Sequence, residues 1–133
     1  MTADGVVEYQ LTGTYDDAKA MVNEVVYAEI SGNSATLRVL SAEQSGVFKR
    51  VKSVTSTGIT IITTEASSGV SEVTADYTYT DDTVWLDKKD SSTGTISWAT
   101  RPVPAYRDDE VILYTDNAYT QSRTKVVVGV VKQ

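Results

Sequence analysis

Turn-forming residues recur at short, fairly regular intervals along the chain, and they limit the length of every element between them. The recurring groups are Gly13, Ser31-Gly32-Asn33, Ser45-Gly46, Ser56-Thr57-Gly58, Ser68-Gly69, Asp81-Asp82, Ser92-Thr93-Gly94 and Asp116-Asn117. Most of their spacings are near those of β-sandwiches and barrels. The chain also holds 19 Val and 19 Thr against 5 Leu, and residues branched at Cβ suit a pleated strand better than a helix. The sequence therefore predicts an all-β protein of short strands.

The clearest strand candidate covers residues 72–80. Val73, Ala75, Tyr77 and Tyr79 alternate there with threonines and an aspartate. Successive side chains on a strand point to opposite faces, so these four share one face. We expect that face to pack against a core and the other face to meet solvent.

Three pairs of segments flank short polar loops and predict β-hairpins. The pairs are 25–30 with 35–40, 46–54 with 59–64, and 83–87 with 95–100. Further strands are expected over residues 6–12, 110–115 and 125–131. About ten strands are more than one flat sheet comfortably holds, so we expect an antiparallel β-sandwich or barrel. No linker of biased composition interrupts the sequence, which predicts a single β domain over residues 1–133.

One segment, residues 16–24, departs from the strand pattern. Ala18, Met21 and Val22 follow a helical spacing, and Thr14 is suitably placed as an N-cap. We therefore expect one short N-terminal helix that closes a barrel end or covers a sheet edge.

The residue types that are absent exclude several functions. The chain contains no Cys and no His, so it has no thiol nucleophile, Ser-His-Asp triad or histidine-ligated metal. A formal charge of −6 and a pI near 4.5 argue against nucleic-acid binding, which depends on Lys and Arg. The sequence has no phosphate-cradling glycine motif and no apolar run long enough for a membrane span. We expect no cofactor, no membrane partner and no enzymatic activity.

Acidic groups occur at Asp16-Asp17, Asp81-Asp82 and Asp108-Asp109-Glu110. Clustered loop carboxylates can bind calcium, and two carboxylates at a suitable separation can hydrolyse glycosides. Neither chemistry has its usual motif spacing here, whereas turns and caps use such residues routinely. We therefore expect no metal site and interpret Asp81-Asp82 as a turn between two strands.

Trp85 is the residue best suited to ligand binding. If its neighbours Val84 and Leu86 face the core, alternation leaves Trp85 on the exposed face, near Tyr77 and Tyr79. An exposed indole there would serve carbohydrate binding or a protein interface. The alternative is that Trp85 is half-buried under a loop or a helix.

The only basic cluster is Lys49-Arg50-Val51-Lys52. Consecutive charges point to both faces of a strand, which suits an edge strand protected by lysine. Alternatively, Lys49, Arg50 and Lys52 bind an acidic partner surface, for example on another copy of this chain.

Both prolines lie in the segment 100–105. Each proline favours extended backbone before it, so the segment is expected to be stiff. It is either a crossover between sheets or an arm on a neighbouring chain. In the second case Pro102 and Pro104 would make the contact, with Arg101 and Arg107 as its anchors.

The C-terminal strand candidate is apolar on both faces. Val126, Val128 and Val130 are expected on one face, and Val127 and Val131 on the other. Such a strand is central in its own sheet, or it packs against a neighbouring chain through Val127 and Val131.

In overall character the chain resembles small accessory proteins of tailed-bacteriophage virions, namely capsid decoration (cement) proteins and β-structured tail or fibre components. The resemblance consists of the leaderless start at residues 1–5, the Ser/Thr/Gly hairpin tips and the Val-rich segment 125–131. It implies a symmetric homo-oligomer, often a trimer, seated on a capsid or tail and performing no chemistry. It carries over no residue role.

We therefore expect a structural virion protein that acts through protein–protein interfaces and is assembled in the host cytoplasm. The alternative is a carbohydrate-binding β-module that uses Trp85, Tyr77 and Tyr79.

Overall fold

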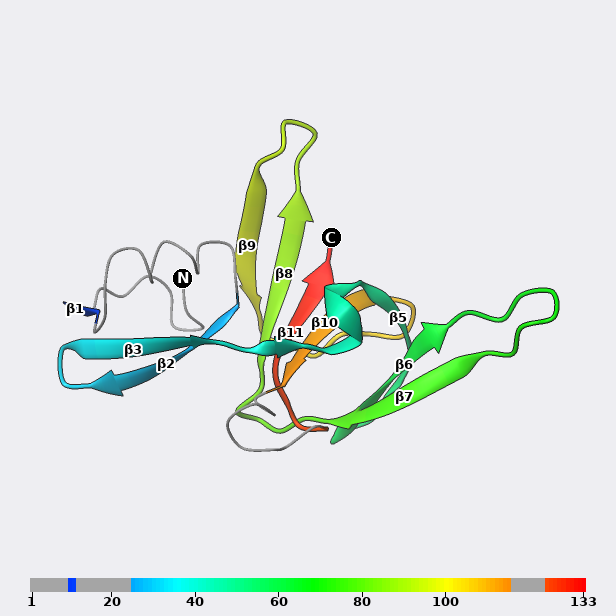
Figure 1. The fold of residues 1–133 in the computed structure, drawn as a ribbon, viewed down its shortest axis with the longest axis horizontal. Helices are drawn as coiled ribbons and strands as arrows, with labels where there is room; N and C mark the ends of the chain where they lie inside the picture. The colour runs from blue at the N-terminus through cyan, green and yellow to red at the C-terminus, as the bar shows by residue number, and fades with distance from the viewer. Residues whose placement is uncertain (1–9, 12–24, 116–123) are drawn as a thin grey trace.

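The computed structural model of the chain describes residues 10–11, 25–115 and 124–133, and Figure 1 shows their arrangement. The strands are β1 (Gln10–Leu11), β2 (Val26–Ser31), β3 (Ser34–Val39), β4 (Ser41–Ala42), β5 (Lys49–Val54), β6 (Gly58–Thr64), β7 (Val73–Thr78), β8 (Val84–Asp90), β9 (Ile96–Arg101), β10 (Glu110–Thr115) and β11 (Val126–Lys132). A 3-10 turn, η1 (Glu43–Gly46), precedes β5. The all-β prediction is confirmed for these residues, among which there is no α-helix. The helix expected over residues 16–24 lies outside them, as does most of the strand expected over 6–12.

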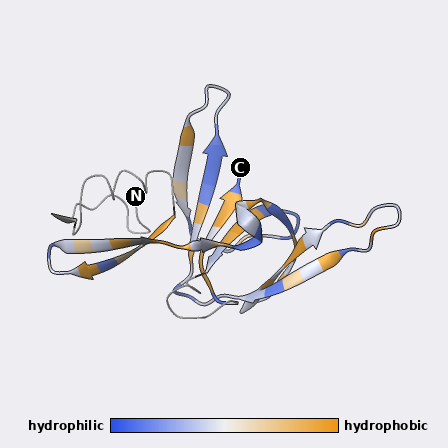
Figure 2. Ribbon diagram, viewed as in Figure 1, coloured by the Kyte–Doolittle hydropathy of each residue, from blue (hydrophilic) through white to orange (hydrophobic). Residues whose placement is uncertain are grey.

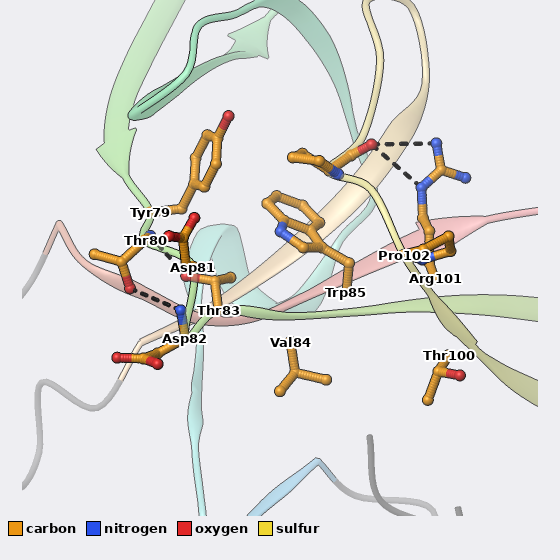
Figure 3. Close-up of a pocket in the computed structure, with 11 residues that line it drawn as sticks. Tyr79, Thr80, Asp81, Asp82, Thr83, Val84, Trp85, Thr100, Arg101 and Pro102 are labelled. Carbon is orange, nitrogen blue, oxygen red and sulfur yellow. Dashed lines mark hydrogen bonds between the residues drawn. The ribbon is translucent and has the colours of Figure 1, made fainter. Parts of the chain in front are cut away.

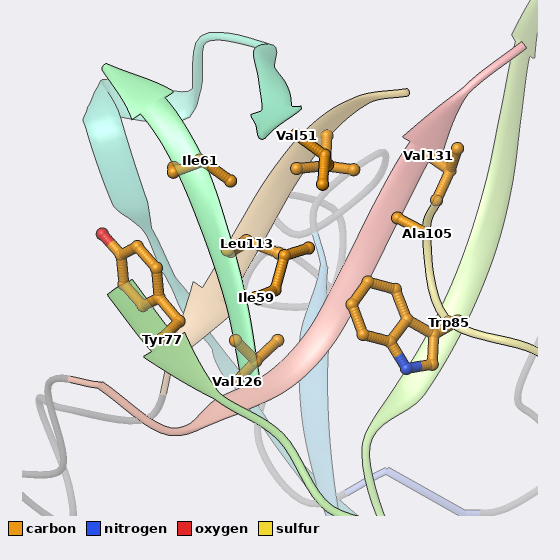
Figure 4. Packing of buried hydrophobic residues seen from close by; sticks show 10 residues of the cluster. Val51, Ile59, Ile61, Tyr77, Trp85, Ala105, Leu113, Val126 and Val131 are labelled. Atoms are coloured by element: carbon orange, nitrogen blue, oxygen red, sulfur yellow. The ribbon is translucent and has the colours of Figure 1, made fainter. Parts of the chain in front are cut away.

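The strands form one sheet of three strands and one of eight. The smaller sheet has the order β1-β3-β2, and the larger has the order β7-β6-β5-β10-β11-β8-β9, with β4 also paired to β10. Most pairs are antiparallel, but β8 runs parallel to β11. The larger sheet is open and closes no barrel among the described residues. It is bent, so that β5, β6 and β7 face β11 and β8 across a shared core (Figure 4).

All three predicted hairpins are present. β2 pairs with β3 through a two-residue loop between Ser31 and Ser34, in which Gly32 has a φ of 57°. That left-handed conformation is the one such tight loops require, and glycine adopts it without strain. β5 pairs with β6 and β8 with β9. The β8 strand runs to Asp90, beyond its expected end at residue 87.

Two hydrophobic clusters lie on opposite faces of the larger sheet. The first contains Val51, Ile59, Leu113 and Trp85 among its buried residues (Figure 4). The second is centred on Val128 and Val130, and it is covered by residues at the base of the β2–β3 hairpin. The C-terminal strand is therefore central and buried on both sides, as one of the two interpretations of its sequence predicted.

A β-bulge in β11 changes which valines share a face. Thr115 pairs with Val126 but Tyr114 pairs with Val128, so Val127 is an extra residue in the ladder. A bulge residue shifts the alternation by one position. Val126 consequently lies in the first cluster and Val128 in the second. The prediction that they share a face is wrong because alternation alone does not foresee the bulge.

Candidate functional site

A cleft opens between the β7–β8 turn (residues 79–83), the start of β8 and the segment that follows β9. Its volume is about 780 Å³. Residues that line it include Tyr79, Asp81, Asp82, Trp85, Arg101 and Pro102 (Figure 3). The sequence singled out an aromatic set and a proline segment separately, and the structure brings members of both to this one cleft.

Trp85 forms the buried wall of the cleft. It is only 5% exposed, and the edge of its ring meets Tyr79 at a centroid distance of 5.6 Å and an interplanar angle of 86°. Val84 and Leu86 pack against the second cluster on the opposite face of the sheet. Of the two interpretations of Trp85, exposure is therefore wrong, and burial is more complete than the half-buried alternative, because the bent sheet gives this strand a core on each face. So deeply buried a ring offers no open face for stacking on a sugar.

The indole Nε1–H of Trp85 has no hydrogen-bond acceptor in the part of the chain that the structure describes. Its nitrogen lies on the side of the ring that faces the β7–β8 turn (Figure 3). Buried indole N–H groups usually have an acceptor, because leaving one unpaired costs free energy. The cleft is therefore bordered by a buried donor that has no acceptor among the described residues.

The β7–β8 turn is fixed by hydrogen bonds of its threonines. The Asp82 amide donates to Thr80 Oγ1 at 3.2 Å, and the Thr80 amide donates to Thr83 Oγ1 at 3.1 Å. Thr83 Oγ1 in turn donates to the buried carbonyl of Val126 at 2.8 Å. The predicted turn at Asp81-Asp82 is confirmed, and both side chains are exposed at the rim of the cleft.

The acidic groups assemble no metal site within residues 10–11, 25–115 and 124–133, where no group of three or more potential ligands converges. Asp16-Asp17 lies outside those residues. Asp108 and Asp109 instead form ion pairs with arginines, at 2.9 Å to Arg50 and 3.5 Å to Arg101.

The proline segment crosses the chain's own sheet. It connects β9, at one edge, to β10 in the interior, and Ala105 within it is buried in the first cluster. The Arg101 guanidinium donates to the carbonyls of Val103 and Pro104 at 3.1 to 3.3 Å, and it pairs with Asp87 at 3.1 Å. The predicted crossover is present, but it lies within one sheet rather than between two. Arg101 anchors it internally.

The other three residues predicted to contact a partner here are more exposed than the guanidinium of Arg101 or lack its internal ion pairs. Pro102 is exposed and Pro104 half-buried, and both line the cleft. Arg107 is exposed, and it forms no ion pair with any described residue. The hypothesis of a partner contact at Pro102, Pro104 and Arg107 stays a prediction.

The basic cluster lies on β5, which is interior in the sheet because it pairs with both β6 and β10. The prediction of an edge strand is therefore wrong. Arg50 forms a two-pronged ion pair with Glu65 at 2.9 and 3.0 Å, which lowers the pKa of Glu65 and raises that of Arg50. Lys52 pairs with Glu72, and Lys49 donates to the carbonyl of Thr63 at 3.1 Å. All three basic side chains are thus paired within the chain, Arg50 and Lys52 with acids and Lys49 with a carbonyl.

Tyr77 and the C-terminal valines lie mainly in the core. Tyr77 is 7% exposed, its hydroxyl accepts a hydrogen bond from Gln44 at 3.3 Å, and burial raises its pKa. It does not line the cleft, unlike Tyr79. Val131 is fully buried and Val127 half-buried. Burial leaves Tyr77 and Val131 little surface for a partner.

Apolar side chains are exposed along three hairpins that project from the body of the protein (Figure 1). We call β2–β3, β6–β7 and β8–β9 the hairpin arms. Exposed apolar residues on them are Ile30, Val39, Val70, Val73 and Ile96. Figure 2 shows apolar residues toward the outer end of each arm. This surface was not predicted, although the sequence has an apolar residue close to each predicted tip, namely Ile30, Val73 and Ile96.

Comparison of the chain with protein-family models, with curated proteins and with solved structures gave no match. The described part of the chain contains no helix long and apolar enough to cross a membrane.

Proposed function

We propose that this chain is a structural subunit that assembles with copies of itself through its hairpin arms. The observation that carries the proposal is the exposure of Ile30, Val73 and Ile96, at 48%, 51% and 38%, on three separate projecting hairpins. Projecting strands with apolar residues are a ready surface for pairing with another chain. Three such surfaces on one subunit suit a lattice or ring better than a single dimer contact.

The setting we propose is a virion, where the subunit decorates a capsid or a tail. The support for this setting is the resemblance of the sequence to phage accessory proteins. The proposal includes no catalytic residue.

Light scattering on a sizing column tests the proposal with the full chain. The expected mass is that of a dimer or larger closed oligomer. Val73→Lys and Ile96→Lys are expected to shift the mass toward the monomer, because a lysine placed in an apolar interface lacks a partner for its charge.

The matched controls are Thr74→Lys and Ser97→Lys, which add the same charge at neighbouring exposed positions. They should leave the mass unchanged, because successive side chains lie on opposite faces of a strand. A monomer at every concentration, or equal effects of both sets of variants, would contradict assembly through the arms.

A further inference from the structure

We propose that the cleft beside Trp85 binds a neutral saccharide, one or two sugar units long, through hydrogen bonds rather than through ring stacking. This inference is independent of the proposed assembly, because the cleft lies at the β7–β8 turn whereas Ile30, Val73 and Ile96 lie next to the hairpin tips.

The buried indole sets the first requirement on the ligand. Trp85 is 5% exposed, its nitrogen faces the β7–β8 turn (Figure 3), and its N–H finds no acceptor among the described residues. A ligand that fills the cleft displaces any water from this donor. It must therefore bring an acceptor oxygen of its own, or the donor stays buried and unpaired.

The carboxylate of Asp81 sets the second requirement on the ligand. Asp81 and Asp82 are both exposed and both border the cleft, and neither forms an ion pair within the described residues. Figure 3 shows the carboxylate of Asp81 on the same side as Trp85, whereas that of Asp82 is directed away from the ring. Ionised carboxylates only accept hydrogen bonds, so the ligand must also donate. Carboxylates repel an anion, and the positive charge of Arg101 in the same cleft is already paired with Asp87 and Asp109, so the cleft disfavours phosphates and acidic ligands. A simple cation would satisfy the carboxylates but would leave the N–H of Trp85 unpaired.

A sugar hydroxyl meets both requirements, because it donates one hydrogen bond and accepts others. The remaining walls suit the carbon skeleton of a sugar, since Tyr79, Pro102 and Pro104 present apolar surface. The volume of about 780 Å³ is within the range of small-molecule sites, about 300 to 1,000 Å³. Arg101 takes part by fixing the wall, because its guanidinium holds the carbonyl of Pro104.

Nuclear magnetic resonance on the ¹⁵N-labelled full chain tests the proposal. The chain has only two tryptophans, so two indole N–H signals are expected, and Trp98→Phe assigns them. The probes are maltose, lactose, cellobiose and diacetylchitobiose at up to about 50 mM, enough to detect millimolar affinity. We expect at least one of them to move the Trp85 signal in a saturable manner and to leave the Trp98 signal in place.

Asp81→Asn is the decisive variant, because the side chain of Asp81 is exposed and its change should not unfold the protein. It should weaken the binding about tenfold, the effect of one charged hydrogen bond. Asp90→Asn, an exposed position outside the cleft, removes the same charge and should bind as the wild type does. A Trp85 signal that no sugar moves, or equal affinity of Asp81→Asn and wild type, would overturn the proposal. Movement by the dipeptide Lys-Lys alone would overturn it in favour of a basic peptide. The oligomeric mass enters none of these readouts.

Discussion

The indole ring of Trp85 lies directly against the backbone of Gly129. The two residues are register partners on β8 and β11, and a Cβ built on Gly129 would come within 2.3 Å of Cζ3 of the ring. Glycine in a strand interior usually weakens the strand, and it often marks a close approach of another group. Here the missing side chain provides the space that allows Trp85 to lie in the core.

Gly129→Ala should therefore destabilise the protein. The added methyl group has no room unless Trp85 moves, and overpacking of this kind costs about 2 to 3 kcal/mol of unfolding free energy. Urea unfolding followed by tryptophan fluorescence measures the change. Gly94→Ala is the control, because its Cβ would meet no atom within 4 Å and only its φ of +83° opposes the substitution. Its cost should be about 1 kcal/mol. Equal losses in the two variants would show that the ring does not lie on Gly129.

Arg101→Lys should also be destabilising, although it keeps the charge. The guanidinium holds two carbonyls of the crossover and pairs with Asp87 and Asp109, and its side chain is only 12% exposed. An ammonium group cannot reproduce that planar set of donors. The expected loss is about 1 to 2 kcal/mol, because partly buried acceptors such as the Pro104 carbonyl are left unpaired.

Arg107→Lys provides the comparison for this change. Arg107 is exposed and has no ion pair with a described residue, so the same substitution should alter the unfolding free energy by less than about 0.5 kcal/mol. Urea midpoints of the two variants decide the matter. Similar midpoints would mean that Arg101 does not anchor the crossover.

The hairpins were predictable from the sequence because each depends on residues that are close in the chain. Ser31 pairs with Ser34 across a glycine-containing loop, and such local signals are readable in sequence. The environment of Trp85 depends instead on β11, more than 40 residues away, which lies beside β8 in parallel register. Alternation shows that neighbouring residues lie on opposite faces of a strand. It does not show which face is covered by other residues, or whether both faces are covered.

The basic cluster and the valines were misjudged for the same physical reason. The partners of Arg50 are Glu65 and Asp108, which only the folded sheet brings to β5. The face of Val128 changes at a bulge that the pairing with β10 defines. The candidate cleft was predictable only in its parts, because the β7–β8 turn and the crossover become neighbours through that non-local strand order.

Acid should remove the stabilisation that the Arg50–Glu65 pair provides. The hydrogen-bonded guanidinium of Arg50 lowers the pKa of Glu65 below its usual 4.5. A group whose pKa is lowered on folding stabilises the protein above its unfolded pKa, and this contribution disappears as the pH falls through the folded pKa. The Glu65 carboxyl should therefore titrate below 4.5 in a carbon-detected NMR titration.

Arg50→Gln supplies the control for that titration. It keeps a polar side chain on β5 and removes the positive charge that lowers the pKa of Glu65. The Glu65 pKa should rise toward its usual value in this variant. Because the pair is exposed, high salt should have the same effect in part. An identical titration in wild type and variant would show that the pair does not form in solution.

Alkali should destabilise the protein through Tyr77. Burial raises the pKa of this phenol above its usual 10.0, and the nearby charge of Glu43 acts in the same direction. The folded state therefore binds the phenol proton more tightly than the unfolded chain does. The stabilisation is present below the unfolded pKa of 10.0 and is lost as the pH rises through the folded pKa.

Tyr77→Phe isolates this effect, because it removes the titrating group and keeps the ring in the core. At neutral pH the variant should lose about 1 kcal/mol or less, the contribution of the hydrogen bond from Gln44. As the pH rises above 10.0, the wild type should lose stability faster, so that the two unfolding curves approach each other and then cross. Urea midpoints on both sides of that pH measure the difference. A constant difference between wild type and variant would mean that Tyr77 titrates alike in the folded and unfolded states, and hence that its hydroxyl reaches water in the folded protein.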